Sequence, residues 1–355
     1  MKNILLIIGT LTLSFIIFTS GTTIKDKEED QKGTLIIANK SGDDVSLIDR
    51  ATGKTIKKLP SGLQPHEVEV SGDGKFAVVS NYGDNDNPGN TLSVYDVKRA
   101  KLLKTVDLED NTRPHGMEWL NGTSKMLVTT EGTESLLLVD IEKGEIDQKM
   151  NTEQEISHMV AAAPDGKYAY VSSIRTGNVT VFNLETGELL KQLYSGEGAE
   201  GIAVSPDGKE LWVTNRAENT IAVFNTKELE LTEKLECGDF PIRTKFSPDG
   251  KHFVVSNAES GEIAVFDANK KEIIKKIKLT PPVPEDKDAE RYFDEFEGTS
   301  VPIGIVVPDN KTVYIANTRS DVISVLNLEE MEITEHFEAG KEPDGINFSP
   351  IMSKK

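Results

Sequence analysis

The chain has 355 residues, and its 59 acidic residues outnumber its 40 lysines and arginines, which gives a formal net charge of −19 at pH 7. Binding to nucleic acid without sequence preference requires a cationic surface, so this charge argues against DNA or RNA as a partner. The charge also disfavours docking on anionic membranes. The only cysteine, Cys237, cannot form an internal disulfide, so the fold must hold by packing, and we expect Cys237 to be a small buried filler.

The first 21 residues differ from the rest of the chain. Lys2 supplies a positive start, residues 4–18 form an apolar run broken only by Gly, Ser and Thr, and residues 19–21 are small. The pattern predicts a secretory signal peptide over residues 1–21, and hence export to the periplasm, the cell surface or the extracellular space. An uncleaved N-terminal anchor is the alternative, and it would be the one contact with a membrane. Residues 22–32 are polar and charged and predict a flexible leader.

A short phrase recurs seven times in the body of the chain. Its second positions fall at residues 66, 115, 158, 200, 242, 303 and 344, and the steps between them are 49, 43, 42, 42, 61 and 41 residues. A period near 42 with strand-like content is typical of a β-propeller blade. In one copy, four antiparallel strands are predicted at residues 201–205, 210–215, 220–225 and 231–235, and a Pro-Asp-Gly-Lys turn joins the first two.

The two ends of the repeat region complement one another. Residues 34–59 supply three strands with no inner strand before them, and residues 343–349 supply an inner strand with nothing after it. Joining them makes a seventh blade and closes the ring without an open sheet edge. The sequence therefore predicts an all-β, seven-bladed propeller over residues 33–350, with four antiparallel strands per blade, a tail at 351–355 and a monomeric state.

Motifs at the ends of the second strands carry a family resemblance. Val213-Thr214-Asn215 and its equivalents follow Pro-Asp-Gly-Lys-type turns and resemble the YVTN-type propeller repeat of surface-layer, YncE-like exported and lactonase-type proteins. The resemblance covers residues 33–350 and implies the fold, but these proteins include binders, scaffolds and enzymes. Pro65-His66 and the segment 79–83, followed by residues 91–96, resemble the lactonase-type branch, which implies ring-opening or lyase chemistry.

The repeated phrase predicts a polar site at the mouth of the central channel. Strand parity puts the blade junctions on the same face as the loops between second and third strands. In ring order, the second positions of the phrase are Asp344, His66, His115, His158, Glu200, Ile242 and Ile303. Three of only five histidines share this register with two carboxylates, and such sets bind divalent transition metals such as Zn, Cu, Fe or Ni.

We therefore interpret these five polar residues as candidate metal ligands, and His66, His115 and His158 also as candidate catalytic acids or bases. The alternative is that each of them merely hydrogen-bonds water or a neighbouring strand end. Five arginines are expected on the same face and would form a cationic funnel for a carboxylate or phosphate ligand. With three further polar residues, the candidate ligand-binding set is Arg113, Arg175, Arg216, Arg243, Arg319, Asn81, Tyr82 and Tyr292.

Two irregular loops belong to this face. The junction between residues 279 and 301 is long and acidic, and it predicts either a lid with a short helix at 286–296 and inward-pointing aromatics, or a solvated insertion. Residues 83–90 have the oxygen-rich composition of a calcium loop, but they lack the EF-hand spacing, so a polar turn is favoured.

Three functions remain open on the sequence alone, which contains no nucleophile, zinc-protease or phosphate-loop motif. We favour a binding module for a metal ion or a small anionic ligand at the channel mouth. The alternatives are a lactonase- or lyase-type enzyme that uses a histidine of the mouth, and an envelope scaffold that docks another protein.

Overall fold

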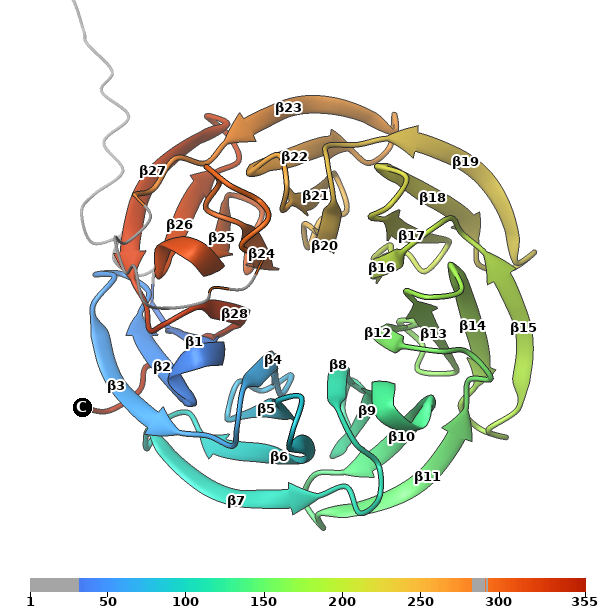
Figure 1. The fold of residues 1–355 in the computed structure, drawn as a ribbon, viewed down its shortest axis with the longest axis horizontal. Helices are drawn as coiled ribbons and strands as arrows, with labels where there is room; N and C mark the ends of the chain where they lie inside the picture. Colours follow the sequence, from blue (N-terminus) through green and yellow to red (C-terminus); the bar gives the residue numbers. More distant parts are fainter. Residues whose placement is uncertain (1–31, 283–290, 292) are drawn as a thin grey trace, which may run out of the picture. The chain divides into compact units, whose positions relative to one another are not determined.

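The computed structural model describes residues 32–282, 291 and 293–355. The expected signal peptide, the leader up to residue 31 and Tyr292 lie outside the described residues. Within them, 28 β-strands form seven four-stranded antiparallel sheets that surround a central axis as the blades of a ring (Figure 1). The predicted seven-bladed, all-β propeller is therefore confirmed. No helix in this part of the chain is long and apolar enough to cross a membrane.

Six blades consist of consecutive strands that run in order from the axis to the rim. Their bounds, blade by blade, are β4 (Pro65–Val70), β5 (Phe76–Gly83), β6 (Pro88–Asp96) and β7 (Lys101–Asp107); β8 (Pro114–Trp119), β9 (Lys125–Thr130), β10 (Ser135–Asp140) and β11 (Glu145–Asn151); β12 (Ser157–Ala162), β13 (Tyr168–Ser173), β14 (Asn178–Asn183) and β15 (Leu189–Tyr194); β16 (Ala199–Val204), β17 (Glu210–Asn215), β18 (Thr220–Asn225) and β19 (Glu230–Glu236); β20 (Pro241–Phe246), β21 (His252–Asn257), β22 (Glu262–Asp267) and β23 (Glu272–Lys278); and β24 (Pro302–Val306), β25 (Thr312–Asn317), β26 (Val322–Asn327) and β27 (Glu332–Glu338). Short 3₁₀ turns lie at Lys40–Gly42, Glu131–Thr133 and Thr318–Ser320.

The seventh blade joins the two ends of the chain, as predicted. The C-terminal strand β28 (Pro343–Ser349) pairs with β1 (Thr34–Asn39), and β2 (Asp44–Asp49) and β3 (Thr55–Pro60) complete the sheet. The residues after β28 are also held in place, because the backbone N–H of Ser353 donates to Thr34 Oγ1 at 2.9 Å and that of Lys354 donates to the carbonyl of Lys98 at 3.0 Å. This closure leaves every inner strand hydrogen-bonded on its outer side.

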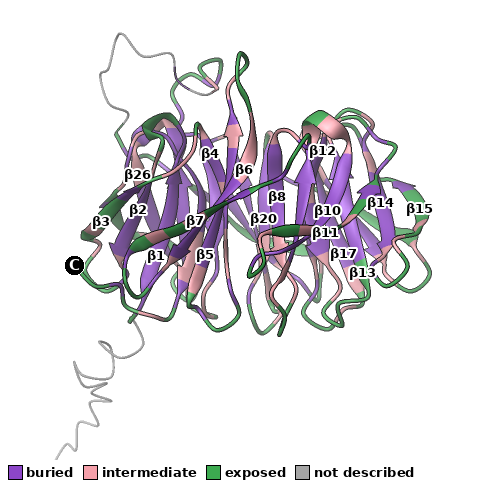
Figure 2. Ribbon diagram, turned by 90° about the horizontal axis from the view of Figure 1, so that it is seen from below, coloured by how far each residue is buried: buried purple, intermediate pink, exposed green. Residues whose placement is uncertain are grey.

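The apolar core lies between neighbouring blades. The inner strands carry buried apolar residues, whereas outermost strands such as β11 expose most of their side chains. In one core, Trp212 packs on Phe253 and Phe266, and none of the three exceeds 1% exposure. Cys237 is buried in the same cluster, as expected. Figure 2 shows this distribution, with buried residues along the middle of each blade and exposed residues in the loops at both faces.

Two backbone features recur at each blade junction. The residue before every inner strand is in the left-handed region, with φ between 44° and 74°. These seven residues are Gln64, Arg113, Ile156, Gly198, Phe240, Val301 and Glu342. Directly afterwards, the register between the inner and second strands shifts in all seven blades. A bulge at this point takes the second residue of the strand out of the ladder and re-aims its side chain, so it sets the direction of the residues that line the channel mouth.

The second strands support these bulges through hydroxyl groups. Thr129 Oγ1 donates to the carbonyl of His158 at 2.6 Å, Ser172 Oγ to that of Glu200 at 2.5 Å, and Ser256 Oγ to that of Ile303 at 2.7 Å. Each bond runs from one blade to the bulge of the next. The middle residue of the repeated Val-Thr-Asn motif therefore fixes the backbone of the neighbouring blade at the mouth.

Glycines at the third position of several inner strands allow the blades to approach closely. A Cβ on Gly304 would lie 2.0 Å from the carbonyl oxygen of Asp344, and one on Gly116 would lie 2.6 Å from that of His158. Because these contacts are with backbone, a side chain at either position would push two inner strands apart.

We predict that Gly304→Ala destabilises the protein by about 1–3 kcal/mol, the usual range for overpacking. Gly72→Ala is the matched control, because its Cβ would meet nothing closer than 4.0 Å and its φ is also outside the left-handed region. Denaturant unfolding followed by circular dichroism should show a lower midpoint for Gly304→Ala only. Equal midpoints in the two variants would contradict this account of the channel wall.

Candidate functional site

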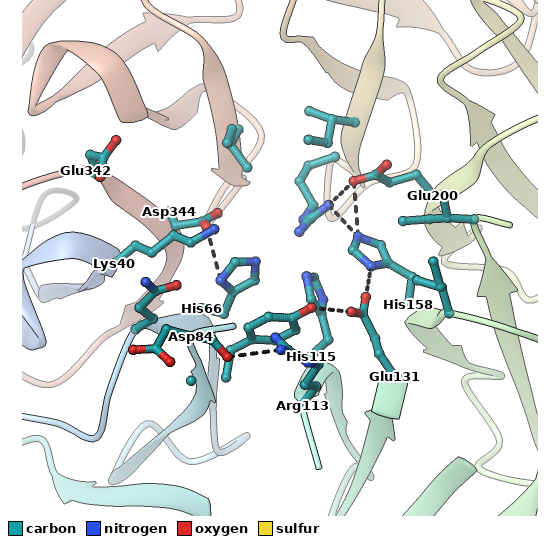
Figure 3. Close-up of a pocket in the computed structure, with 18 of the residues that line it drawn as sticks. Lys40, His66, Asp84, Arg113, His115, Glu131, His158, Glu200, Glu342 and Asp344 are labelled. Carbon is teal, nitrogen blue, oxygen red and sulfur yellow. Dashed lines mark hydrogen bonds and ion pairs between the residues drawn. The ribbon is translucent and has the colours of Figure 1, made fainter. Parts of the chain in front are cut away.

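A cavity of about 570 Å³ opens at the mouth of the central channel (Figure 3). The second residues of all seven inner strands line it, which agrees with the placement argued from strand parity. We call them the mouth ring: Asp344, His66, His115, His158, Glu200, Ile242 and Ile303. Five of the seven are polar and face two isoleucines, so the cavity has a polar side and an apolar side.

Three imidazoles are packed together on the polar side. The ring centroids of His66 and His115 are 4.5 Å apart, and those of His115 and His158 are 3.8 Å apart. The three residues are 4%, 1% and 6% exposed, so none of them points into bulk solvent. Burial lowers the pKa of His66 and of His115 well below the ordinary value, and nearby cations lower it further. Both imidazoles are therefore neutral at pH 7 and can accept a proton or bind a metal ion.

His158 differs from the other two because carboxylates flank both of its nitrogens. Nδ1 lies 2.5 Å from Glu131 Oε1, and Nε2 lies 3.1 Å from Glu200 Oε1. Burial alone would lower the pKa of His158, but attraction and hydrogen bonding to the two carboxylates outweigh burial and raise it. In this arrangement His158 carries a proton on each nitrogen.

Glu200 is the centre of a buried charge cluster. Besides His158, it accepts from Arg216 Nη1 at 2.7 Å and from Arg243 Nη1 at 3.0 Å. Burial raises the pKa of Glu200, but these three cations outweigh burial and hold the pKa at about 2. Arg243 also donates from Nη2 to Glu67 Oε1 at 2.6 Å, which links two inner strands that are far apart in the chain. Arg243 lines the cavity, whereas Glu67 does not.

Glu131 is a site residue that sequence reasoning missed. It begins the 3₁₀ turn after β9. Its Oε1 contacts Nδ1 of His158, and its Oε2 accepts a hydrogen bond from the Tyr82 hydroxyl at 2.5 Å. A usable signal existed, because Glu131 is the first residue after the second-strand motif. In each blade, one residue directly follows this motif, and we call these residues the loop ring. Those that line the cavity are Lys40, Tyr82, Glu131, Ile174 and Arg216.

Three residues of the site approach the geometry of a metal centre. One ligand atom from each of His115, Glu131 and His158 lies within 4.8 Å of the others. Nδ1 of His115 is buried and has no hydrogen-bond partner among the described residues. Two imidazoles and a carboxylate are a donor set that zinc and its neighbours accept. The arrangement is therefore able to hold one divalent transition metal.

The other three candidate ligands, Asp344, His66 and Glu200, lie elsewhere on the mouth ring. Asp344 is 1% exposed, and its Oδ2 lies 3.5 Å from Nδ1 of His66. Burial raises the pKa of Asp344 to about 6. Glu200 faces the far nitrogen of His158 and is occupied by the arginines. These positions separate Asp344, His66 and Glu200 from the group formed by His115, Glu131 and His158.

The arginines of the expected funnel have different surroundings. Arg113, Arg216 and Arg243 line the cavity, whereas Arg175 and Arg319 do not. Arg175 is exposed and pairs with Glu155, and Arg319 donates to the carbonyl of Phe296 at 2.8 Å.

Asn81 and Arg291 also differ in whether they face the cavity. The side-chain amide of Asn81 is used inside its own blade, where it donates to Thr91 and Ser93. Arg291, which sequence reasoning missed, lines the cavity and pairs with Asp321.

Both irregular loops contact the rim of the cavity. Asp84 Oδ1 accepts the backbone N–H groups of Asp86 and Asn87, so this carboxylate caps a polar turn at the tip of the β5–β6 hairpin. In the long junction, the described residues 293–299 form turns, and the short helix expected there is wrong for that part. Its aromatics do point inward, because Phe293 and Phe296 pack on Phe240 with centroids 5.5 and 4.9 Å away.

Comparisons with known proteins agree with a lactonase-like propeller. Residues 158–287 match the family model described as "Lactonase, 7-bladed beta-propeller". Antigen Lp49 of Leptospira interrogans serogroup Icterohaemorrhagiae serovar copenhageni (strain Fiocruz L1-130) is 27% identical over 159 residues, which are 44% of this chain. The match spans 34% of that protein, about a third of its length. These matches do not single out the YVTN-type repeat.

Two solved structures share the fold. A functionally unknown protein from Desulfotomaculum acetoxidans DSM 771 has a TM-score of 0.74 at 13% identity, with 90% of this chain and 99% of that chain covered. Hydrazine synthase of Kuenenia stuttgartiensis has a TM-score of 0.69 at 19% identity, with 88% and 99% covered. At these identities the likeness concerns the fold alone.

We predict that Glu200→Gln lowers the free energy of unfolding by about 3–5 kcal/mol near pH 6, because it removes one partner from a buried charge cluster. Since the pKa of Glu200 falls from an ordinary 4.5 to about 2 on folding, the contribution of its carboxylate is complete above pH 4.5 and is lost as the pH falls toward 2. Denaturant unfolding at several pH values should show the variant and the wild type converging in acid.

Glu155→Gln is the control, because its ion pair with Arg175 is more than half exposed on both sides. A stability gap between Glu200→Gln and the wild type that stayed constant or widened on acidification would contradict the charge assignment.

Proposed function

We propose that this propeller binds a divalent transition metal ion at the mouth of its central channel, through His115, Glu131 and His158. The observation that carries the proposal is the convergence of three ligand atoms within 4.8 Å in a buried site. Nδ1 of His115 supports the proposal, because this buried atom has no hydrogen-bond partner among the described residues and an ion would satisfy it.

The surroundings of His158 also favour a metal site. Metal-binding imidazoles usually donate their second N–H to a carboxylate, which fixes the ring and increases its basicity. Glu200 stands in this position at Nε2, and Arg216 and Arg243 hold Glu200 in turn. In the protein without metal, a proton lies between Nδ1 of His158 and Glu131. The ion would take the place of this proton and release it on binding.

The donor set favours zinc and its neighbours over calcium or magnesium. Calcium and magnesium prefer sites made of oxygen, whereas imidazole suits Zn, Cu, Fe and Ni. Three protein ligands would leave a fourth position for a further ligand, and all three residues line the cavity of about 570 Å³. The proposed ion is therefore accessible to a further ligand. We propose that the protein performs this role after export, as residues 1–21 predict.

Calorimetry of metal-stripped protein with ZnCl₂ tests the proposal. We expect one Zn²⁺ per chain in the wild type, and at least tenfold weaker binding in His115→Ala and in Glu131→Gln, since each loses one of three ligands. His336→Ala is the control, because His336 lies exposed on the outermost strand β27. Binding that is absent in the wild type, or equal in His115→Ala and His336→Ala, would overturn the metal site.

The match to the lactonase family model favours a second function, the ring opening of a lactone. The neutral imidazoles of His66 and His115 are suited to act as general bases beside Arg113, which would hold a carbonyl or carboxylate oxygen.

A panel of γ- and δ-lactones, followed by acid release, tests this activity. We expect turnover that falls at least a hundredfold in His115→Ala and stays unchanged in His336→Ala. Turnover that survives in His115→Ala would contradict the role of this histidine.

A further inference from the structure

We propose that the site takes a small carboxylate with an apolar body, its carboxylate bound between the metal ion and Arg113 and its apolar end against the isoleucines of the mouth. This inference rests on the proposed metal site and names the class of ligand that its open position accepts.

Arg113 is a half-buried guanidinium without a carboxylate partner among the described residues. Its Nη2 donates to the carbonyl of Asp84 at 3.0 Å, and its Cζ lies 5.1 Å from the ring centroid of Tyr82. Tyr82 in turn donates to Glu131, so Arg113 lies beside the proposed metal ligands. A guanidinium has five donors in a fork that matches a carboxylate. Arg113 therefore offers charge and free donors to an anion at the open metal position.

The other arginines of the cavity are paired with carboxylates. Arg216 and Arg243 are bonded to Glu200, and Arg291 makes a two-point ion pair with Asp321. Arg243 also pairs with Glu67, so each of these three arginines has a carboxylate partner. Among the arginines that line the cavity, Arg113 is thus the one whose charge a ligand would balance.

The apolar side of the cavity limits the rest of the ligand. Ile242 and Ile303 occupy mouth-ring positions that are polar in the other five blades, and they are 2% and 1% exposed. Ile156 and Ile174, both half-buried, extend the apolar lining at the rim. A ligand bound to the metal and Arg113 would bury a hydrocarbon portion here, and each methylene removed from water adds to its affinity. A phosphate or another compact dianion would leave the half-buried Ile156 and Ile174 uncovered, whereas Ile242 and Ile303 are already shielded from water.

Cobalt substitution tests the proposal, because the visible absorption of bound Co²⁺ reports on its coordination. The protein is first titrated with Co²⁺, and the loaded protein is then titrated with sodium acetate, butanoate and hexanoate. We expect each carboxylate to change the cobalt spectrum to saturation, with hexanoate binding at least tenfold more tightly than acetate. Arg113→Gln should weaken all three carboxylates at least tenfold and leave Co²⁺ affinity within about threefold.

The variant is compatible with the backbone, since Gln64 occupies the equivalent left-handed position of the β4–β7 blade. Arg175→Gln is the control, because Arg175 is exposed and does not line the cavity. Failure to bind Co²⁺ would refute the proposed function itself. Intact Co²⁺ binding with no carboxylate response, with equal affinity for acetate and hexanoate, or with no effect of Arg113→Gln would refute the carboxylate proposal alone.

Discussion

The structure depends on one backbone constraint that is applied seven times, the left-handed residue followed by a bulge at the start of each inner strand. This junction turns the second residue of the strand toward the axis, and a hydroxyl from the preceding blade holds several of these residues in place. Because the geometry is the same in every blade, the chemistry of the mouth depends only on which side chain each blade supplies. The backbone geometry of the junction is repeated in all blades, whereas the side chains of the mouth ring differ from blade to blade.

Within that frame, charge pairing decides which groups are available. Glu200 already accepts from His158, Arg216 and Arg243, so in the proposed site it would orient His158 rather than bind the ion directly. The neutral imidazole of His115 and the charge of Arg113 lack such partners among the described residues. A cluster this deeply buried would be costly if it served packing alone, since apolar residues of similar volume would be at least as stable. The proposed binding role gives a reason for this cost.

The repeat made the fold predictable, because a period near 42 with closed ends admits few architectures. The register of His66, His115 and His158 was also readable, since equivalent positions in a ring must share one rim. Arg291 was not found, because it lies in the long junction between β23 and β24, which has no equivalent in the other blades. Glu131 was missed because the positions after the second strands were not compared between blades. The sequence also could not distinguish Arg113 from Arg175, since only the fold shows that one lines the cavity and the other meets solvent. A comparison of loop positions, blade by blade, would have brought Glu131 together with Tyr82 and Arg216.

Anomalous diffraction at the zinc edge, from crystals of the protein soaked in Zn²⁺, tests the central claim most directly. The account predicts one peak at the channel mouth, about 2.0–2.2 Å from a nitrogen of His115, a nitrogen of His158 and an oxygen of Glu131. A map without a peak among these three residues, or with their side chains turned away from one another, would contradict it.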